Sequence, residues 1–120
     1  MLEVTHLSKE YPRNGAAAVL ALKDISFSVI KGEFVSLVGP SGCGKSTLMM
    51  ALAGLSAPTG GAVVLHGQAV RQPPKDMVLV FQNYANSLFP WRSVIGNVLF
   101  GLEQKKLPRA ERRLAAERAL

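Results

Sequence analysis

Residues Gly39–Ser46, which read GPSGCGKS, have the types and spacing needed to bind a polyphosphate. They satisfy the pattern G-x-x-x-x-G-K-[ST], and Thr47 extends it. Glycine allows backbone torsions that a Cβ forbids, so the amides of this segment can turn towards phosphate oxygens at the start of a helix. Lys45 supplies a cation for the β- and γ-phosphates, and the Ser46 hydroxyl is placed to ligate Mg²⁺. The motif therefore predicts nucleotide binding, through Gly39, Ser41, Gly42, Cys43, Gly44, Lys45, Ser46 and Thr47.

The elements that must position this loop are a strand before it and a helix after it. The apolar run Phe34–Val38 predicts a buried strand, and Ser46–Leu55 predicts a helix that stops at Gly54. Alternation in Ile25–Val29 predicts a half-buried strand, which we expect to pair with Phe34–Val38 through a turn at Gly32. The loop thus has the strand–loop–helix setting that a phosphate-binding motif requires.

The rest of the chain predicts further strands and then helices. Leu2–Tyr11, Ala62–Gly67 and Met77–Gln82 have strand patterns, the last of them densely apolar, as in a buried strand. His6 and His66 lie within strand patterns without a second ligand at metal spacing, so we expect structural roles for them. Turn residues occupy Pro12–Gly15, Ser56–Gly61 and Arg71–Asp76. Ser93 can cap a helix whose shared face consists of Val94, Ile95, Val98, Leu99 and Leu102. Pro108 begins a second, Arg-rich helix.

Composition and charge limit the classes of protein that fit. The chain has 120 residues, 48% of them hydrophobic, which is enough for one domain with a core. No apolar run approaches the roughly 18 residues of a membrane span, and no secretory signal is visible. The net charge of +6 raises nucleic acid as a partner, but six of the fourteen basic residues lie between Lys105 and Arg118, as on a solvated helix. The single cysteine, Cys43, cannot form an internal disulfide.

With more than thirty residues before the loop and Gln82 at the end of a later strand, the chain resembles the nucleotide-binding subunit of an ABC transporter. The resemblance implies that Tyr11 stacks on adenine and that Gly39–Thr47 is the Walker A loop. It also implies that Gln82 is the Q-loop glutamine, near Mg²⁺ and the attacking water. The segment Leu88–Glu103, LFPWRSVIGNVLFGLE, is similar to importers of nitrate, taurine and alkanesulfonates. The implied catalytic residues are Lys45 and Gln82, the metal ligands Ser46 and Gln82, and the cofactors ATP and Mg²⁺.

The same resemblance implies the fold, the partners and the location. The expected fold is α/β: a P-loop NTPase core with an N-terminal antiparallel β-subdomain, in residues 1–92, and the start of a helical subdomain, in residues 93–120. The expected partners are transmembrane permease subunits, one of which inserts a helix near Phe89 and Trp91, a second ATP-binding subunit across the nucleotide and, indirectly, a solute-binding protein. The location would be peripheral, at the cytoplasmic face of the membrane.

Parts that hydrolysis requires in this family are missing from the sequence. The two aspartates, Asp24 and Asp76, precede their apolar runs, whereas a Walker B aspartate follows its strand. No Leu-Ser-Gly-Gly-Gln-like signature occurs, and no histidine follows His66. We therefore expect an N-terminal portion of an incomplete domain that binds nucleotide better than it turns it over. Three alternatives stay open: a binding module without catalysis, a soluble ABC-family ATPase acting on nucleic acid or ribosomes, and a P-loop kinase.

Overall fold

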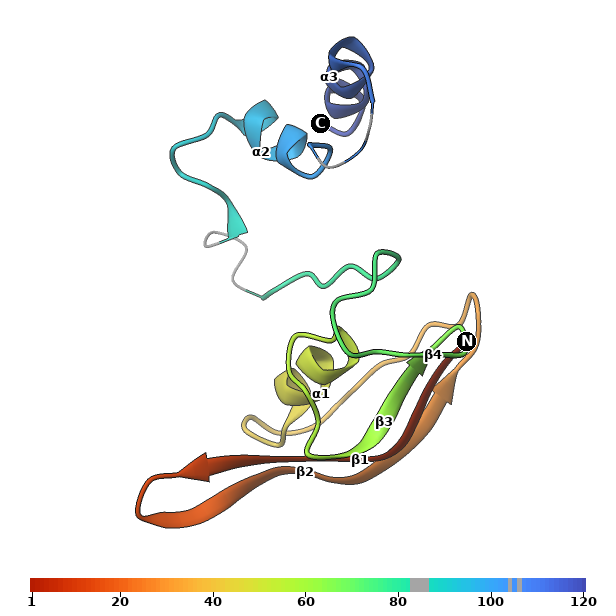
Figure 1. The fold of residues 1–120 in the computed structure, drawn as a ribbon. Helices are drawn as coiled ribbons and strands as arrows, with labels where there is room; N and C mark the ends of the chain where they lie inside the picture. The colour runs from red at the N-terminus through yellow and green to blue at the C-terminus, as the bar shows by residue number, and fades with distance from the viewer. Residues whose placement is uncertain (83–86, 104, 106) are drawn as a thin grey trace. The chain divides into compact units, whose positions relative to one another are not determined.

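The computed structural model describes residues 1–82, 87–103, 105 and 107–120, in two compact units, Met1–Leu79 and Val80–Leu120 (Figure 1). Part of the segment that follows Gln82, residues 83–86, lies outside the described residues, as does Lys106 of the basic cluster. Among the described residues, no helix is long and apolar enough to cross a bilayer.

The first unit is built on a four-stranded antiparallel sheet with the order β2-β1-β3-β4. Its strands are β1 (Leu2–Arg13), β2 (Ala16–Val29), β3 (Gly60–Leu65) and β4 (Gln68–Ala69). β1 and β2 form a long hairpin in which Arg13 pairs with Ala16. Its turn, at Asn14 and Gly15, is the second half of the predicted turn Pro12–Gly15. The predicted strands at Leu2–Tyr11, Ile25–Val29 and Ala62–Gly67 are therefore confirmed, whereas the short β4 was not expected.

Irregular register in the hairpin places the apolar side chains of β1 on one face. Between the pairs Val4–Phe27 and Leu7–Ile25, β1 carries one more residue than β2, and His6 there has φ 48°. An extra residue reverses the alternation of faces, so Val4 and Leu7, three positions apart, are both buried. His6 Nδ1 lies 2.6 Å from Asp24 Oδ1, across the hairpin, which gives His6 the structural role predicted for it.

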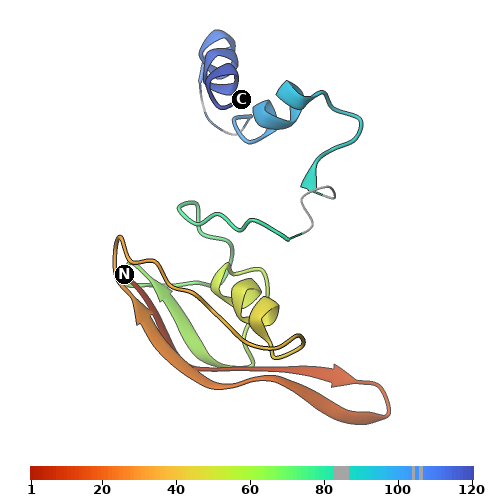
Figure 2. The same ribbon diagram turned by 180° about the vertical axis from the view of Figure 1, so that it is seen from behind.

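The core of this unit lies between the sheet and the helix α1 (Lys45–Leu52). Leu48 and Ala51, three residues apart on the helix, pack with the strand residues Val4, Leu7, Leu22 and Val63. Figures 1 and 2 show from opposite sides that α1 lies over one face of the sheet. The helix begins where the glycine loop ends, so this packing fixes the loop to the sheet.

Two predicted strands are wrong. Phe34–Val38 and Met77–Gln82 are not strands, and Phe34, Val38, Val78 and Val80 are 84–94% exposed. The turn at Gly32 is present, with Glu33 N donating to Ile30 O, but β2 pairs with β1 and not with Phe34–Val38. An apolar run becomes a buried strand only when neighbouring backbone accepts its hydrogen bonds, and none of the described strands pairs with either run.

The second unit contains two short helices, α2 (Val94–Phe100) and α3 (Arg109–Arg118). As predicted, Ser93 caps α2, its hydroxyl accepting a hydrogen bond from Gly96 N at 3.2 Å. Pro108 precedes α3 as its N-cap residue, and Arg112 N donates to Pro108 O. Val94, expected on the apolar face of α2, is 72% exposed and lines a hollow.

Candidate functional site

The structure assembles the glycine loop at the N-terminus of α1. Gly44 is the N-cap residue, in the left-handed conformation with φ 96°, and no side chain caps the helix. The first turn of a helix leaves backbone N–H groups without intrahelical partners, and the helix dipole makes that end positive. Lys45, Ser46 and Thr47 form this turn, so their amides are available to an anion.

The Lys45 ammonium lies over the loop backbone. Its Nζ donates hydrogen bonds to Gly39 O at 2.6 Å and Pro40 O at 2.7 Å, and lies 3.6 Å from Cys43 Sγ. The side chain therefore folds back onto the six residues that precede it. A bound polyphosphate would exchange these carbonyl contacts for charge-assisted hydrogen bonds to phosphate oxygens.

Gly44 also holds the loop against the sheet. A Cβ placed on Gly44 would lie 2.5 Å from Ala21 O and 3.1 Å from Leu22 Cδ2. Ala21 is the additional residue of a bulge in β2, because Leu22 pairs with Lys9 and Leu20 with Glu10. The bulged backbone thus approaches the loop at a position that only glycine can occupy without displacement.

The same contact brings the predicted adenine site near the loop. Tyr11 pairs with Val19 in the hairpin, and Val19 is two residues along β2 from Ala21, which contacts Gly44. Two residues of strand span roughly 7 Å. Tyr11 is 41% exposed, and Lys9 Nζ lies over its ring, 5.1 Å from the centroid. The predicted base and phosphate residues, Tyr11 and Gly39–Thr47, thus belong to one unit.

Gln82, predicted to act near the metal, belongs to the second unit, whereas Ser46 belongs to the first. Ser46 is exposed in the first turn of α1 and offers one hydroxyl oxygen. In the part of the chain that the structure describes, no three His, Cys, Asp or Glu side chains gather into a metal site. Mg²⁺ binds one or two protein oxygens and completes its shell with phosphates and water, so the Ser46 hydroxyl fits that ion as a partner of a bound nucleotide.

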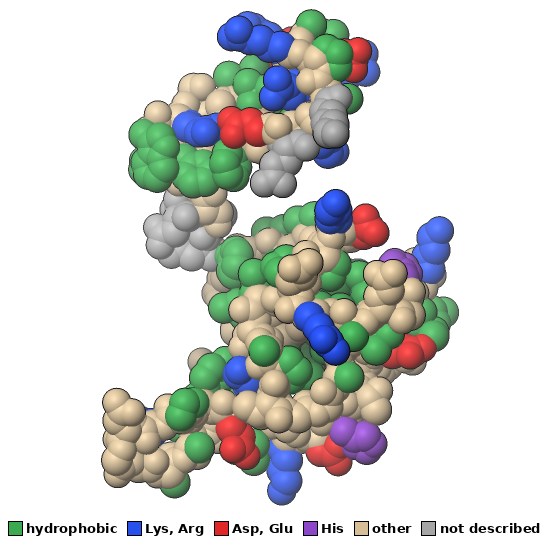
Figure 3. All heavy atoms as spheres, in the orientation of Figure 1, with side chains coloured by type: hydrophobic (Ala, Val, Ile, Leu, Met, Phe, Trp, Pro, Cys, Tyr) green, Lys and Arg blue, Asp and Glu red, His purple; other side chains and the backbone are tan. Residues whose placement is uncertain are grey.

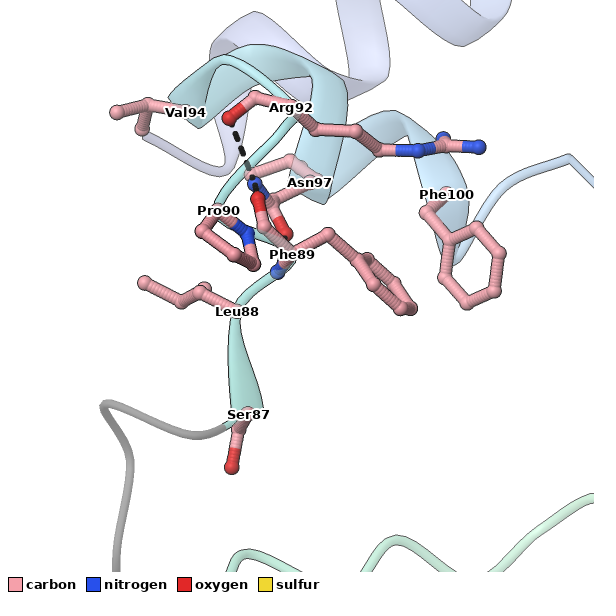
Figure 4. Close-up of a pocket in the computed structure, with 9 residues that line it drawn as sticks. Ser87, Leu88, Phe89, Pro90, Arg92, Val94, Asn97 and Phe100 are labelled. Carbon is pink, nitrogen blue, oxygen red and sulfur yellow. Dashed lines mark hydrogen bonds between the residues drawn. The ribbon is translucent and has the colours of Figure 1, made fainter.

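A second candidate surface lies around the start of α2 (Figure 4). Asn97 ties the preceding segment to the helix: its Oδ1 accepts from Phe89 N at 2.7 Å, and its Nδ2 donates to the carbonyls of Phe89, Arg92 and Ser93. The Arg92 guanidinium lies over the rings of Phe89 and Phe100 and pairs with Glu103 at 2.7 Å. An apolar hollow of about 490 Å³ is bordered by Phe89, Arg92, Asn97 and Phe100, and the neighbouring Trp91 is 77% exposed.

The sequence reasoning missed three residues of these sites. Asn97 carried a signal, because asparagine is a poor helix former and its place inside a helix indicates a specific hydrogen-bonding role. Lys9 also had a signal in the sequence, because it is two residues before Tyr11 and side chains at that spacing share a strand face. Arg92 stands next to Trp91, but its contacts with two rings depend on how α2 packs.

The fold and the loop together define a P-loop nucleotide-binding class of protein. Residues 22–119 match the family described as ABC transporter, so the chain belongs to the ABC transporter family. The predicted P-loop fold with an antiparallel β-subdomain is confirmed by the solved structures that it resembles. The ATP-binding cassette MJ0796, in a dimeric post-hydrolysis state bound to ADP and Pi, matches with a TM-score of 0.82 and 29% identity. That match covers 98% of this chain and 55% of the cassette.

Curated relatives include import proteins. The bicarbonate transport ATP-binding protein CmpC of Synechococcus elongatus is 46% identical over 95% of this chain and 17% of its own length. The nitrate import ATP-binding protein NrtD of a Synechocystis species is 45% identical over 92% of this chain and 41% of its own length. The spermidine/putrescine import ATP-binding protein PotA of Thermobifida fusca is 45% identical over 92% of this chain and 29% of its own length. The chain thus spans less than half the length of each of these relatives.

Proposed function

We propose that this chain binds Mg-ATP at Gly39–Thr47, as the ATP-binding part of an import system. The observation that carries the proposal is the Lys45 ammonium on the loop backbone, at the uncapped N-terminus of α1. A cation and free helix amides in one short loop are the donors that a polyphosphate requires. The chain's membership of the ABC transporter family makes ATP the expected nucleotide.

Each predicted site residue has a role in this proposal. The loop amides and Lys45 bind the phosphates, Tyr11 stacks on adenine, and the Ser46 and Gln82 side chains supply oxygens to Mg²⁺. Gln82 also orients the attacking water. Mg²⁺, when bound, neutralises charge on the phosphates. In phosphoryl transfer most of the catalysis is positioning and charge stabilisation, so the residues of this chain supply binding and orientation of the nucleotide.

The α2 surface is the proposed contact with a transmembrane permease subunit. Phe89 and Phe100 border the hollow, and Trp91 is exposed beside it, so an apolar helix face would bury all three rings. A second ATP-binding subunit is proposed because the matched cassette is dimeric. A solute-binding protein would act indirectly, through the permease, and the chain would lie at the cytoplasmic face of the membrane.

Solute choice is proposed to lie with those partners. The bicarbonate, nitrate and spermidine/putrescine proteins are all 45–46% identical to this chain, although their named solutes differ in charge. What they share with this chain therefore serves the nucleotide and not the solute. The import function can be tested by introducing Lys45→Ala into the protein in the cells that naturally produce it. Uptake of labelled nitrate, bicarbonate and putrescine by these cells is then measured. Uptake of one solute should be lost; normal uptake of all three would contradict the import function with these solutes.

The alternative of a nucleic-acid ATPase has less support. On the face drawn in Figure 3, the basic side chains are spread over the surface of each unit and not gathered into one patch. A nucleic-acid site would bring them together along the phosphate backbone. Binding to RNA or DNA that weakens steeply with added salt would favour that alternative.

Cys43 provides a direct test of nucleotide binding. Its thiol is exposed, and its Sγ lies beside Gly39 and 3.6 Å from Lys45 Nζ. Alkylation with N-ethylmaleimide would therefore place a bulky group in the loop and block Mg-ATP binding. Mg-ATP at ten times its Kd should in turn slow the alkylation roughly tenfold, because only the free protein reacts. The labelling rate is measured by mass spectrometry.

Cys43→Ser is the matched control for this labelling. It removes the only thiol of the chain and should bind Mg-ATP normally after treatment with N-ethylmaleimide. Equal labelling rates with and without Mg-ATP would show that Cys43 lies outside the nucleotide site.

A further inference from the structure

Lys9 and Tyr11 form a pair on β1 that the glycine motif does not explain. The two residues alternate with Glu10 along the strand, so their side chains share a face. Lys9 Nζ lies over the Tyr11 ring, 5.1 Å from its centroid, within the range of a cation–π interaction. One face of the ring is therefore already occupied by the lysine.

The Lys9 ammonium is also held by a backbone carbonyl. Its Nζ donates a hydrogen bond of 2.5 Å to Ala57 O, in the loop between α1 and β3. That loop is tied to β1 through Thr59, whose N and Oγ1 both donate to Ser8 O, at 2.9 and 3.1 Å. Glu10 N in turn donates to Thr59 Oγ1 at 3.1 Å. The lysine is thus anchored to a fixed segment and is half-buried, unlike a free surface lysine.

The anchored Lys9 ammonium restricts the orientation of the Tyr11 ring and the face on which a base can stack. An aromatic ring has two faces, and a flat purine can stack only on a face that is free. With Lys9 over one face, the opposite face is left for the base, and the ring cannot turn without losing the cation–π contact. Tyr11 is still 41% exposed, so a large part of it remains accessible.

We propose that Lys9 is a positioning residue for the purine: it holds the Tyr11 ring so that the base stacks on the face away from the ammonium. This inference rests on the proposed function and names the residue that sets the base contact. Lys9 acts through Tyr11 and does not itself touch the phosphates. Its contribution should therefore depend on the presence of a base in the ligand.

The test compares Mg-ATP with magnesium tripolyphosphate, which has the phosphates but no base, in equilibrium titrations of the whole protein. Lys9→Met keeps the length of the side chain and removes the cation. We expect it to weaken Mg-ATP binding roughly two- to fivefold, the fold-change equivalent to a cation–π contact of about 0.5–1 kcal/mol. Tripolyphosphate binding should be unchanged. Lys9→Arg, which keeps a cation over the ring, should restore Mg-ATP binding to within about twofold.

Two further variants separate the possible outcomes. In a Tyr11→Leu background, Lys9→Met should have no additional effect, because the ring through which it acts is gone. Lys23→Met, which removes an exposed lysine of β2, should leave both ligands unaffected. Equal weakening of ATP and tripolyphosphate by Lys9→Met, or no weakening of either, would overturn the inference. Failure of the proposed function would give a different result. Lys45→Ala would then leave the binding of both ligands unchanged, or the unaltered protein would bind neither of them.

Discussion

Replacing Lys45 by alanine is expected to weaken Mg-ATP binding roughly 30- to 150-fold. A hydrogen bond to a charged group contributes about 1.5–3 kcal/mol, and the lysine is expected to contact both the β- and γ-phosphates. Part of this gain is offset, because the ammonium must leave the Gly39 and Pro40 carbonyls, 2.6 and 2.7 Å away. A net loss of about 2–3 kcal/mol corresponds to the stated fold-change, at 1.4 kcal/mol for each factor of ten.

Isothermal titration with Mg-ATP measures this effect directly. The free protein should keep its stability to within about 1 kcal/mol, since the contacts that the substitution removes are exposed. Lys23→Ala is the matched control: it removes the same charge from an exposed position on β2 and should change the affinity less than about twofold. Unchanged affinity in Lys45→Ala would remove the central support for nucleotide binding by this loop.

The second large effect is expected for Gly44→Ala. Gly44 has φ 96°, and an added Cβ would lie 2.5 Å from Ala21 O, a backbone atom that cannot turn aside as a side chain can. A left-handed conformation costs a residue other than glycine about 1–2 kcal/mol, and displacement of packed backbone adds about 1–3 kcal/mol. We therefore expect the free energy of unfolding to fall by about 2–5 kcal/mol. Mg-ATP binding should be lost, because the loop must move away from the Ala21 bulge of β2 that holds it in place.

Gly42→Ala separates the two causes. Gly42 also has positive φ, 80°, but an added Cβ would meet nothing within 4 Å. Its loss of stability should therefore be only the conformational part, about 1–2 kcal/mol. Urea unfolding followed by circular dichroism compares the variants. Equal losses for Gly42→Ala and Gly44→Ala would show that the contact between the loop and the Ala21 bulge does not hold the loop in place.

The structure changes how the exposed apolar runs are understood. Phe34–Val38 and Met77–Gln82 have the composition of buried strands, yet Phe34 is 94% and Val78 85% exposed. The pattern was interpreted correctly as apolar and β-prone, but strand formation also requires a partner backbone. Composition is a property of a segment, whereas pairing is a property of the fold.

What the sequence determined by itself is local. The phosphate-binding motif, the N-cap at Ser93 and the start of α3 after Pro108 each depend on residues within a few positions of one another, and a single stretch contains the physical cause. The turn at Asn14 and Gly15 was evident for the same reason. α2 and α3 begin where such signals indicate, at Val94 and Arg109, whereas α1 ends at Leu52, before the predicted stop at Gly54.

What only the tertiary structure decided depends on residues far apart in the chain. The bulge that places Ala21 against Gly44, the contact of His6 Nδ1 with Asp24 Oδ1 and the anchoring of Lys9 on Ala57 join positions separated by 18 to 48 residues. No periodicity encodes them, because each follows from the register between strands and from which loop packs on the sheet. The sequence determined that a phosphate loop exists. The fold decided what holds that loop and the Tyr11 ring in position.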